Sequence, residues 1–358
     1  MSFLGATRQG ATTPDLNSSA AGNTRESATG NGRDGHAPGV HDASQHEGAS
    51  CEQAYELARG LAANLRSVLL GAPGAISAAV VCALAGGHLL IEDVPGVGKT
   101  MLARGLASSL GCGLSRVQGH PDLLPSDVVG VSVYSQESGT WDLRPGPLLA
   151  NVVLFDELNR TPPRTQSALL EAMEEGQTTI DGETYRLPVP HMVIATQNPV
   201  EELGTFPLVE SQRDRFAIAT SIGYPDAATE AKVALEQGGP GALADLEPVC
   251  GPDGWLDAQR ATRSVFVDGR IAAFAVAICD ATRRAPAVRL GASPRAAMWL
   301  LRSARAHALV SGRDFTTPGD VKAVAVASLA HRLVTDEGIE QAVDTVRITL
   351  DSVSAPRP

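Results

Sequence analysis

The residues with the clearest chemical signature form a tight Pro/Gly turn that ends in Gly98, Lys99 and Thr100. An apolar run, residues 89–91, precedes the turn, and a helix-like stretch, residues 101–107, follows it. Glycines let backbone N–H groups curl round phosphates, and the start of a helix presents the positive end of its dipole. Lys99 can reach the β- and γ-phosphates of a nucleotide, and the Thr100 hydroxyl can ligate Mg²⁺. The turn therefore predicts a phosphate-binding loop.

One residue of this loop departs from the general P-loop pattern, which opens with glycine, because Asp93 stands at that position. The alternative is an ordinary strand-to-helix turn with an exposed lysine. The Gly-Lys-Thr ending, with a strand before it and a helix after it, favours the phosphate loop. The residues expected to bind the nucleotide are Asp93, Val94, Pro95, Gly96, Val97, Gly98, Lys99, Thr100 and Met101.

Two adjacent carboxylates, Asp156 and Glu157, follow the apolar run 152–155. Four consecutive apolar residues indicate a strand buried on both faces, as in a parallel sheet covered by helices. Asp156 can then hold the Mg²⁺ shell, and Glu157 can orient the attacking water or accept its proton. An acidic helix cap is the alternative for either residue alone. It explains the pair less well downstream of a phosphate loop.

Three further polar residues could take part in the chemistry, and each has a plain alternative. Asn198 follows an apolar strand, residues 192–196, and could bind a water or the γ-phosphate, although alone it favours a turn. Arg213 and Arg215 flank an acid, which usually indicates a solvated surface but also suits an arginine finger. Arg295 near the start of a helix slightly opposes the helix dipole, which an anionic partner would explain, and the alternative is an exposed arginine.

The whole chain suggests a two-domain enzyme of 358 residues. A net charge of −11 argues against a protein that mainly grips nucleic acid, so no nucleic-acid partner is expected. Five scattered cysteines without C-x-x-C spacing indicate a reducing compartment. We recognise no targeting segment and no membrane segment, and we expect a cytoplasmic location.

The composition divides the chain into three parts. Residues 1–50 are rich in Gly, Ser, Thr, Asn and Asp and predict a disordered tail. Residues 51–224 alternate helical and strand patterns and include a hairpin signal, Asp181-Gly182. Pro225 marks a boundary, and residues 225–358 are Ala-rich with helical periodicity, including a helix capped by Ser293.

Taken together, these residues resemble the MoxR family of AAA+ ATPases over approximately residues 55 to 350. The blocks that carry the resemblance are residues 91–100, 121–127, 145–148, 155–160, 166–175, 195–199, 204–208, 214–216 and 291–296. An aspartate at position 93 is common in that family. The resemblance implies an α/β fold: an AAA+ P-loop NTPase core with a parallel sheet flanked by helices, a hairpin before the Asn198 strand, and a C-terminal all-α lid.

The resemblance also implies roles for the weaker signals. Asn198 looks like the sensor that positions the lytic water, Arg295 like the lid sensor of the γ-phosphate, and Arg215 like the finger supplied to a neighbouring subunit. Arg213 stands where the family usually has leucine, and Val209 where it has proline, so the choice between the two arginines stays open. The implied cofactors are ATP and Mg²⁺.

The family implies a homo-oligomer, a hexameric ring in its relatives, that remodels client proteins. The work is chaperone-like, such as maturation of complexes or insertion of metal cofactors, often with a partner bearing a von Willebrand A domain. Two other classes remain open: a DNA-associated remodeller or transcription activator, and a nucleotide-gated scaffold with little hydrolysis.

Overall fold

The computed structural model describes residues 49–199, 204–235 and 240–357. The predicted tail, residues 1–50, therefore lies outside the described residues apart from its last two. Ser50 caps helix α1, because its side-chain oxygen accepts a hydrogen bond from the Gln53 N–H at 3.2 Å.

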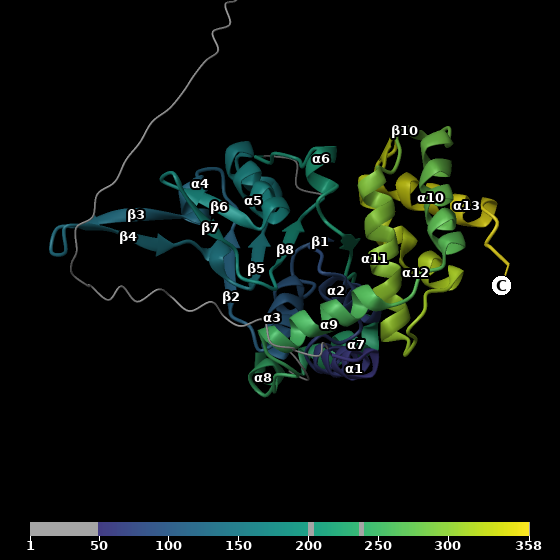
Figure 1. The fold of residues 1–358 in the computed structure, drawn as a ribbon, viewed down its shortest axis with the longest axis horizontal. Coiled ribbons are helices and arrows are strands. Elements are labelled where there is room, and N and C mark those ends of the chain that lie inside the picture. Colours follow the sequence, from purple (N-terminus) through teal and green to yellow (C-terminus); the bar gives the residue numbers. More distant parts are fainter. Residues whose placement is uncertain (1–48, 200–203, 236–239, 358) are drawn as a thin grey trace, which may run out of the picture. The chain divides into compact units, whose positions relative to one another are not determined.

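A parallel sheet of five strands forms the centre of the fold (Figure 1), in the order β2-β5-β8-β1-β9. The strands are β1 (Leu89–Glu92), β2 (Leu114–Gln118), β5 (Val152–Asp156), β8 (Met192–Gln197) and β9 (Ile218–Thr220). All five residues of β5 are buried, which confirms the predicted strand covered on both faces. In register, Gln118 pairs with Asp156 and Glu92 with Gln197, so these polar ends lie at one edge of the sheet.

Helices cover both faces because side chains alternate along each strand. Leu89 and Ile91 belong to one apolar cluster, shared with α1, α2 and α3, whereas Leu90 belongs to a second cluster, shared with α4 and α5. The bounds are α1 (Cys51–Val68), α2 (Pro73–Ala85), α3 (Lys99–Ser109), α4 (Pro125–Val129) and α5 (Pro163–Glu175), with 3₁₀ turns at Pro147–Leu149 and Leu158–Arg160. This layering confirms the predicted α/β class.

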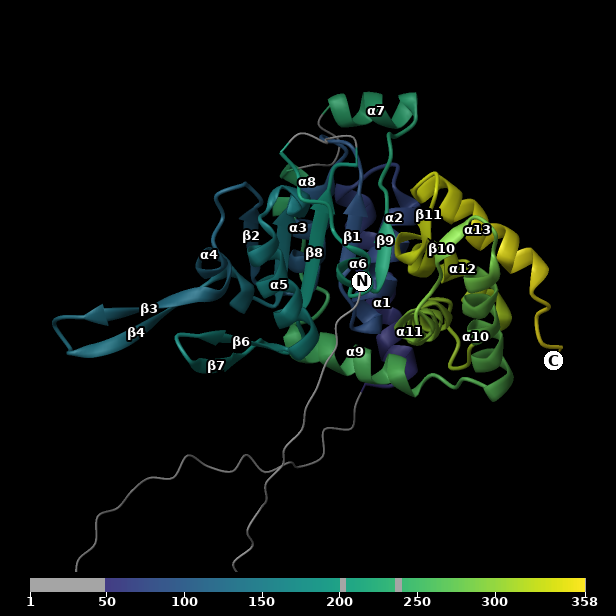
Figure 2. The same cartoon turned by 90° about the horizontal axis from the view of Figure 1, so that it is seen from above.

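Two hairpins accompany the sheet, formed by β3 (Gly130–Ser135), β4 (Thr140–Pro145), β6 (Gln177–Ile180) and β7 (Glu183–Arg186). The β6–β7 hairpin turns at Asp181, as the sequence predicted. The other hairpin consists of β3 and β4. It extends away from the sheet (Figures 1 and 2) and exposes Tyr134 and Trp141 in an edge-on ring contact. The Ser132 N–H binds the Asp181 carboxylate at 2.9 Å and so links the two hairpins.

The C-terminal part is mainly helical. The short helix α6 (Glu210–Arg213) precedes β9, and the elements after β9 are α7 (Ala227–Ala234), α8 (Pro240–Ala244), α9 (Pro252–Ser264), α10 (Gly269–Arg284), α11 (Pro294–Val310), α12 (Pro318–Leu329), a 3₁₀ turn (Ala330–Arg332) and α13 (Ile339–Ser352). The predicted C-terminal helical lid is thus present, and two short strands, β10 (Val288–Leu290) and β11 (Val334–Thr335), pair antiparallel between its helices. Valine-containing segments that connect helices can pair in this way without any signal in the helical periodicity.

Helix α9 packs against α1 and α2, although it follows the predicted domain boundary. Trp255 Nε1 and Gln259 Nε2 both donate to the Ala83 carbonyl, at 3.0 and 2.9 Å. The boundary at residues 224 and 225 therefore stays a prediction.

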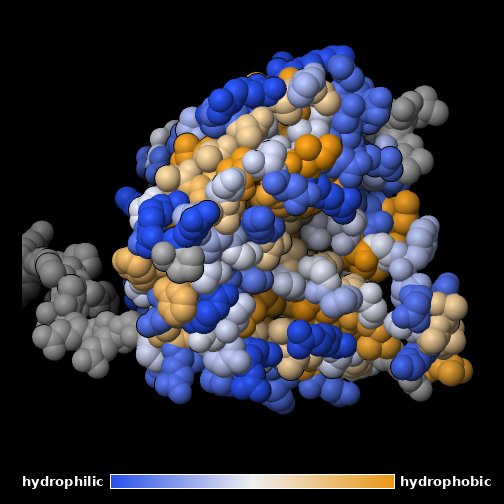
Figure 3. All heavy atoms as spheres, turned by 90° about the vertical axis from the view of Figure 1, so that its right-hand side faces the viewer, coloured by the Kyte–Doolittle hydropathy of each residue, from blue (hydrophilic) through white to orange (hydrophobic). Residues whose placement is uncertain are grey.

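The side of the molecule that carries the lid helices displays apolar side chains among hydrophilic ones (Figure 3). The lid elements expose Val276 of α10, Leu290 of β10 and Ile348 of α13. Within the described ranges, no helix combines the length and the apolar character needed to cross a membrane.

Candidate functional site

The phosphate loop joins β1 to α3 and owes its shape to two glycines. Gly96 and Gly98 have φ angles of 86° and 102°, in the left-handed region that side chains rarely adopt. A Cβ on Gly98 would also lie 2.6 Å from Leu69 Cδ1. Helix α3 begins at Lys99, so its first N–H groups and its positive dipole end belong to the loop. The loop thus forms a cradle for an anion.

The Lys99 ammonium lies back against its own loop, where Nζ donates to the carbonyl oxygen of Asp93 at 2.6 Å. Burial lowers the pKa of Lys99 below its usual range, although the negative charges of Asp93, Asp156 and Glu157 partly oppose the shift. Because a main-chain carbonyl is a modest partner for an ammonium, a phosphate could replace it readily.

A cleft of about 360 Å³ brings the separate motifs of the sequence together. It is lined by Pro95, Gly96, Gly98, Lys99, Thr100, Met101, Arg116, Gln118, Asp156, Glu157, Thr196 and Asn198. Most of the loop residues predicted to bind nucleotide line this cleft, together with the two carboxylates and Asn198. Asp93, Val94 and Val97 are outside its lining.

Glu157 has an unusual backbone, with φ 56° and ψ 50° in the left-handed region. Such a conformation costs free energy in a non-glycine residue and is often retained at functional sites. Gly119 makes room for it, because a Cβ there would lie 2.2 Å from the Glu157 carbonyl oxygen. The Thr196 hydroxyl accepts from the Glu157 N–H at 3.0 Å and donates to Asp156 at 3.3 Å. Thr196 therefore fixes both carboxylates relative to β8.

Three residues that the sequence reasoning missed contact these carboxylates. Arg116 Nε binds Asp156 at 2.7 Å, and Gln118 Nε2 binds Glu157 at 2.9 Å. Arg160 also pairs with Glu157, at 3.2 Å. Arg116 and Gln118 alternate along β2, whose last residue is in register with Asp156. The sequence did contain a signal for Arg116 and Gln118, because both are polar residues toward the end of the strand that pairs with β5, the strand ending in Asp156.

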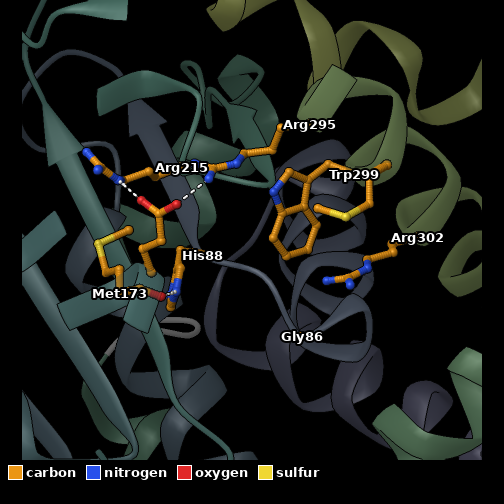
Figure 4. Close-up of a pocket in the computed structure, with 9 residues that line it drawn as sticks. Gly86, His88, Met173, Arg215, Arg295, Trp299 and Arg302 are labelled. Carbon is orange, nitrogen blue, oxygen red and sulfur yellow. Dashed lines mark hydrogen bonds and ion pairs between the residues drawn. The ribbon is translucent and has the colours of Figure 1, made fainter. Parts of the chain in front are cut away.

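The two predicted arginines, Arg215 and Arg295, come together at another place (Figure 4), where both bind Glu174 of α5. Arg215 Nε donates to one Glu174 carboxylate oxygen at 2.8 Å, and Arg295 donates to the other. These bonds, that from Arg215 first, hold the pKa of Glu174 below its usual range. The cavity beside them, about 370 Å³, is lined by Gly86, His88, Met173, Glu174, Arg215, Arg295, Met298, Trp299 and Arg302. It shares no lining residue with the cleft at Lys99.

Arg213 points elsewhere. Its Nε donates to the Leu208 carbonyl at 3.1 Å, and its side chain lines a third cavity together with Glu92 and Asn198. Burial raises the pKa of Glu92, which accepts a hydrogen bond from Gln197. Both arginines are thus engaged inside their own subunit, Arg213 with the Leu208 carbonyl and Arg215 with Glu174.

Asp214, between the two arginines, joins this segment to the lid. Its carboxylate accepts from Ser293, the cap of α11, at 3.0 Å and from Arg332 Nε at 3.0 Å. Arg332 is almost fully buried, and burial lowers its pKa to about 10 against the opposing charge of Asp214. Asp214 precedes Arg215 by one residue, and Ser293 precedes Arg295 by two. The bond between Asp214 and Ser293 therefore holds the backbone next to both arginines in place.

A parallel sheet with this strand order, a phosphate loop after β1, two carboxylates after β5 and a helical lid defines a P-loop ATPase of the AAA+ class. Residues 88–218 match the family described as ATPases associated with various cellular activities (AAA), and residues 280–349 match the AAA lid domain. The chain belongs to the MoxR family of AAA+ ATPases, as the following relatives show.

YeaC of Bacillus subtilis is 44% identical over 82% of this chain and 93% of its own length. Chaperone MoxR1 of Mycobacterium tuberculosis is 37% identical over 83% of this chain and 82% of its own. A crystal structure of a candidate ATPase from Cytophaga hutchinsonii superposes with a TM-score of 0.76 at 32% identity, covering 86% of this chain and 98% of that one. The family predicted from the sequence is therefore confirmed.

Proposed function

We propose that this ATPase works as a homo-oligomeric ring that hydrolyses ATP with Mg²⁺ to remodel client proteins. The observation that carries the proposal is the gathering of Lys99, Thr100, Asp156, Glu157 and Asn198 in one cleft. Lys99 would bind the β- and γ-phosphates, Glu157 would orient the attacking water, and Asn198 would position that water.

The cleft has the donor set that Mg²⁺ prefers, since the Thr100 hydroxyl and the Asp156 carboxylate both line it. When bound, the ion would neutralise the charge that develops on the transferred phosphoryl group. Arg116 occupies Asp156 in this structure and would have to yield part of that contact.

The position of the arginines supports assembly. Arg215 and Arg295 line a cavity that shares no residue with the cleft of their own subunit. In our proposal both are presented to the nucleotide of a neighbouring subunit, with Arg215 as the finger and Arg295 as the lid sensor. The exposed apolar side chains of the lid also favour packing against another protein surface. We propose a hexamer, as the family resemblance suggests.

The client remains a matter of family analogy. Similarity to Chaperone MoxR1 supports chaperone-like maturation of protein complexes. Insertion of a metal cofactor, a partner with a von Willebrand A domain and a cytoplasmic location stay predictions on the same basis.

The test is steady-state ATP turnover against protein concentration, for the wild type, Glu157→Gln and Arg215→Ala. We expect specific activity to rise with concentration and to collapse in both variants, since a finger contributes roughly three to five decades in rate. A mixture of the two variants should regain activity, because an intact Glu157 and an intact Arg215 then meet at some junctions.

Other outcomes would point to the alternatives. Turnover that is independent of concentration and insensitive to Arg215→Ala would contradict the trans arginine and direct attention to Arg213. Wild-type protein without turnover under any condition would favour the nucleotide-gated scaffold, and salt-dependent DNA binding would favour the DNA remodeller.

A further inference from the structure

The carboxylate of Asp93 is engaged entirely by backbone N–H groups, and two of them come from a distant segment. One oxygen accepts from Ile222 at 2.6 Å and from Gly223 at 2.8 Å, and the other accepts from Val94 at 2.8 Å. The Asp93 residue is 8% exposed, so these bonds are largely shielded from water. Hydrogen bonds from N–H groups to an ionised carboxylate are among the stronger ones in proteins.

The segment that Asp93 holds is the connection that leaves the sheet. Residues 222 and 223 follow β9 and precede Pro225 and α7, and Figure 2 shows the chain running from β9 to α7. This connection leads from the strands of the nucleotide-binding part to the helices of the C-terminal part. A residue that fixes it can therefore influence how the C-terminal part is attached.

The same residue also holds the loop lysine, because the Asp93 carbonyl oxygen accepts from Lys99 Nζ at 2.6 Å. Asp93 thus contacts the phosphate-binding group through its main chain and the connection through its side chain. A glycine, which opens the general P-loop pattern, could make the first contact but not the second.

From this arrangement we infer that Asp93 is a positioning residue that couples occupation of the phosphate loop to the Ile222–Gly223 connection. A triphosphate in the loop draws Lys99 Nζ away from the Asp93 carbonyl. The peptide unit after Asp93 then shifts. The Asp93 carboxylate moves with it and passes the shift to the N–H groups of Ile222 and Gly223. The inference rests on the proposed nucleotide site and adds to it a route from nucleotide to lid.

The test is hydrogen exchange of the Ile222 and Gly223 amides in the full-length protein, with and without the magnesium complex of a non-hydrolysable ATP analogue. In the wild type we expect the analogue to change their exchange rates by about threefold or more, as a local opening equilibrium would. Asp93→Gly should raise their exchange about tenfold without nucleotide, because two strong acceptor contacts are lost. The variant should still bind the analogue, but binding should no longer change these two amides.

Kinetics provide a second readout. Asp93→Gly should lower kcat by a larger factor than it raises KM, since the loop still binds while the coupling is lost. The matched control is Asp226→Ala, which removes the cap of α7, where Asp226 accepts from Thr229 N at 2.8 Å. It loosens the same connection without touching the loop, so the nucleotide response of Ile222 and Gly223 should persist.

The outcomes separate this inference from the proposed function. Analogue binding to the wild type with no change at Ile222 and Gly223 would overturn the coupling alone, as would an unaltered response in Asp93→Gly. Failure of the wild type to bind the analogue would overturn both. If Asp93→Gly does not fold, Asp93→Asn decides, because its amide keeps one acceptor and should retain only part of the response.

Discussion

Glu174 of α5 accepts a hydrogen bond from Arg295 of α11, so a single carboxylate joins the nucleotide-binding part of the chain to the lid. The other oxygen of the same carboxylate holds Arg215. Two arginines 80 positions apart in the sequence are thereby oriented by one acid, and Asp214 reinforces the arrangement through Ser293.

Glu174→Gln should therefore lower ATP turnover by about tenfold or more at protein concentrations that saturate the wild type, because a neutral amide orients both arginines less firmly. Nucleotide affinity should change little, since Glu174 does not line the cleft at Lys99. Turnover and binding of a fluorescent ATP analogue measure the two effects. Glu175→Gln is the control, because within the described residues the Glu175 carboxylate accepts from Gln177 and pairs with neither arginine. Full turnover in Glu174→Gln would contradict the positioning role.

Thr196→Val should impair catalysis more than folding. Valine matches threonine in shape and suits a strand, but it leaves the Glu157 N–H without its acceptor and removes the donor to Asp156. We expect kcat to fall by about ten- to a hundredfold, which corresponds to the usual cost of an unpaired buried polar group. Thr196→Ser restores the hydroxyl and should recover most of the rate. Equal losses in the valine and serine variants would show that the hydroxyl is not the cause.

Asp214→Asn should destabilise the junction between the core and the lid. Arg332 has a side chain 1% exposed, and the variant would leave its buried charge without a full counter-charge. Breaking such a pair costs about 3–5 kcal/mol in the free energy of unfolding, which urea unfolding measures. The control is Asp344→Asn, whose ion pair with Arg347 is 66% exposed on both sides and should contribute less than about 1 kcal/mol. Similar effects of the two variants would argue against a stabilising role for the buried pair.

Acid should destabilise the fold in two stages. Burial lowers the pKa of His88 to about 3, and its ring accepts from Val193 N and contacts the Met173 carbonyl. The unfolded chain therefore binds the extra proton first, and the free energy of unfolding falls as the pH drops from about 6.5 towards 3. Hydrogen bonds, that from Arg313 first, overcome the effect of burial and hold the pKa of Asp320 well below its usual range.

The contribution of Asp320 is thus complete above its unfolded pKa of about 3.9 and is lost at lower pH. Urea unfolding between pH 7.5 and 4 should show His88→Gln with a slope smaller by up to about 1.4 kcal/mol per pH unit. The exposed loop residue His120 is the control, and His120→Gln should leave the slope as in the wild type. An unchanged slope in His88→Gln would contradict the assignment.

The sequence by itself determined the parts of the site that depend on local order. The phosphate loop, the buried strand before Asp156 and the turn at Asp181 follow from residue types and spacing over a few positions, and all three are present. The resemblance to the family implied a place for Asn198 at the same site as Lys99 and Asp156, and the three residues line one cleft.

Only the tertiary structure decided the contacts between distant segments. Asp93 binds residues about 130 positions away, Gln118 reaches Glu157 across 39 positions, and Arg295 meets Glu174 across 121. The strands β4, β10 and β11 were likewise not predicted. Such contacts depend on strand register and on how helices pack, and those are set by the sum of many weak interactions over the whole chain. Local propensity does not encode these contacts, which explains why the sequence predicted candidate reacting groups but not the residues that contact them.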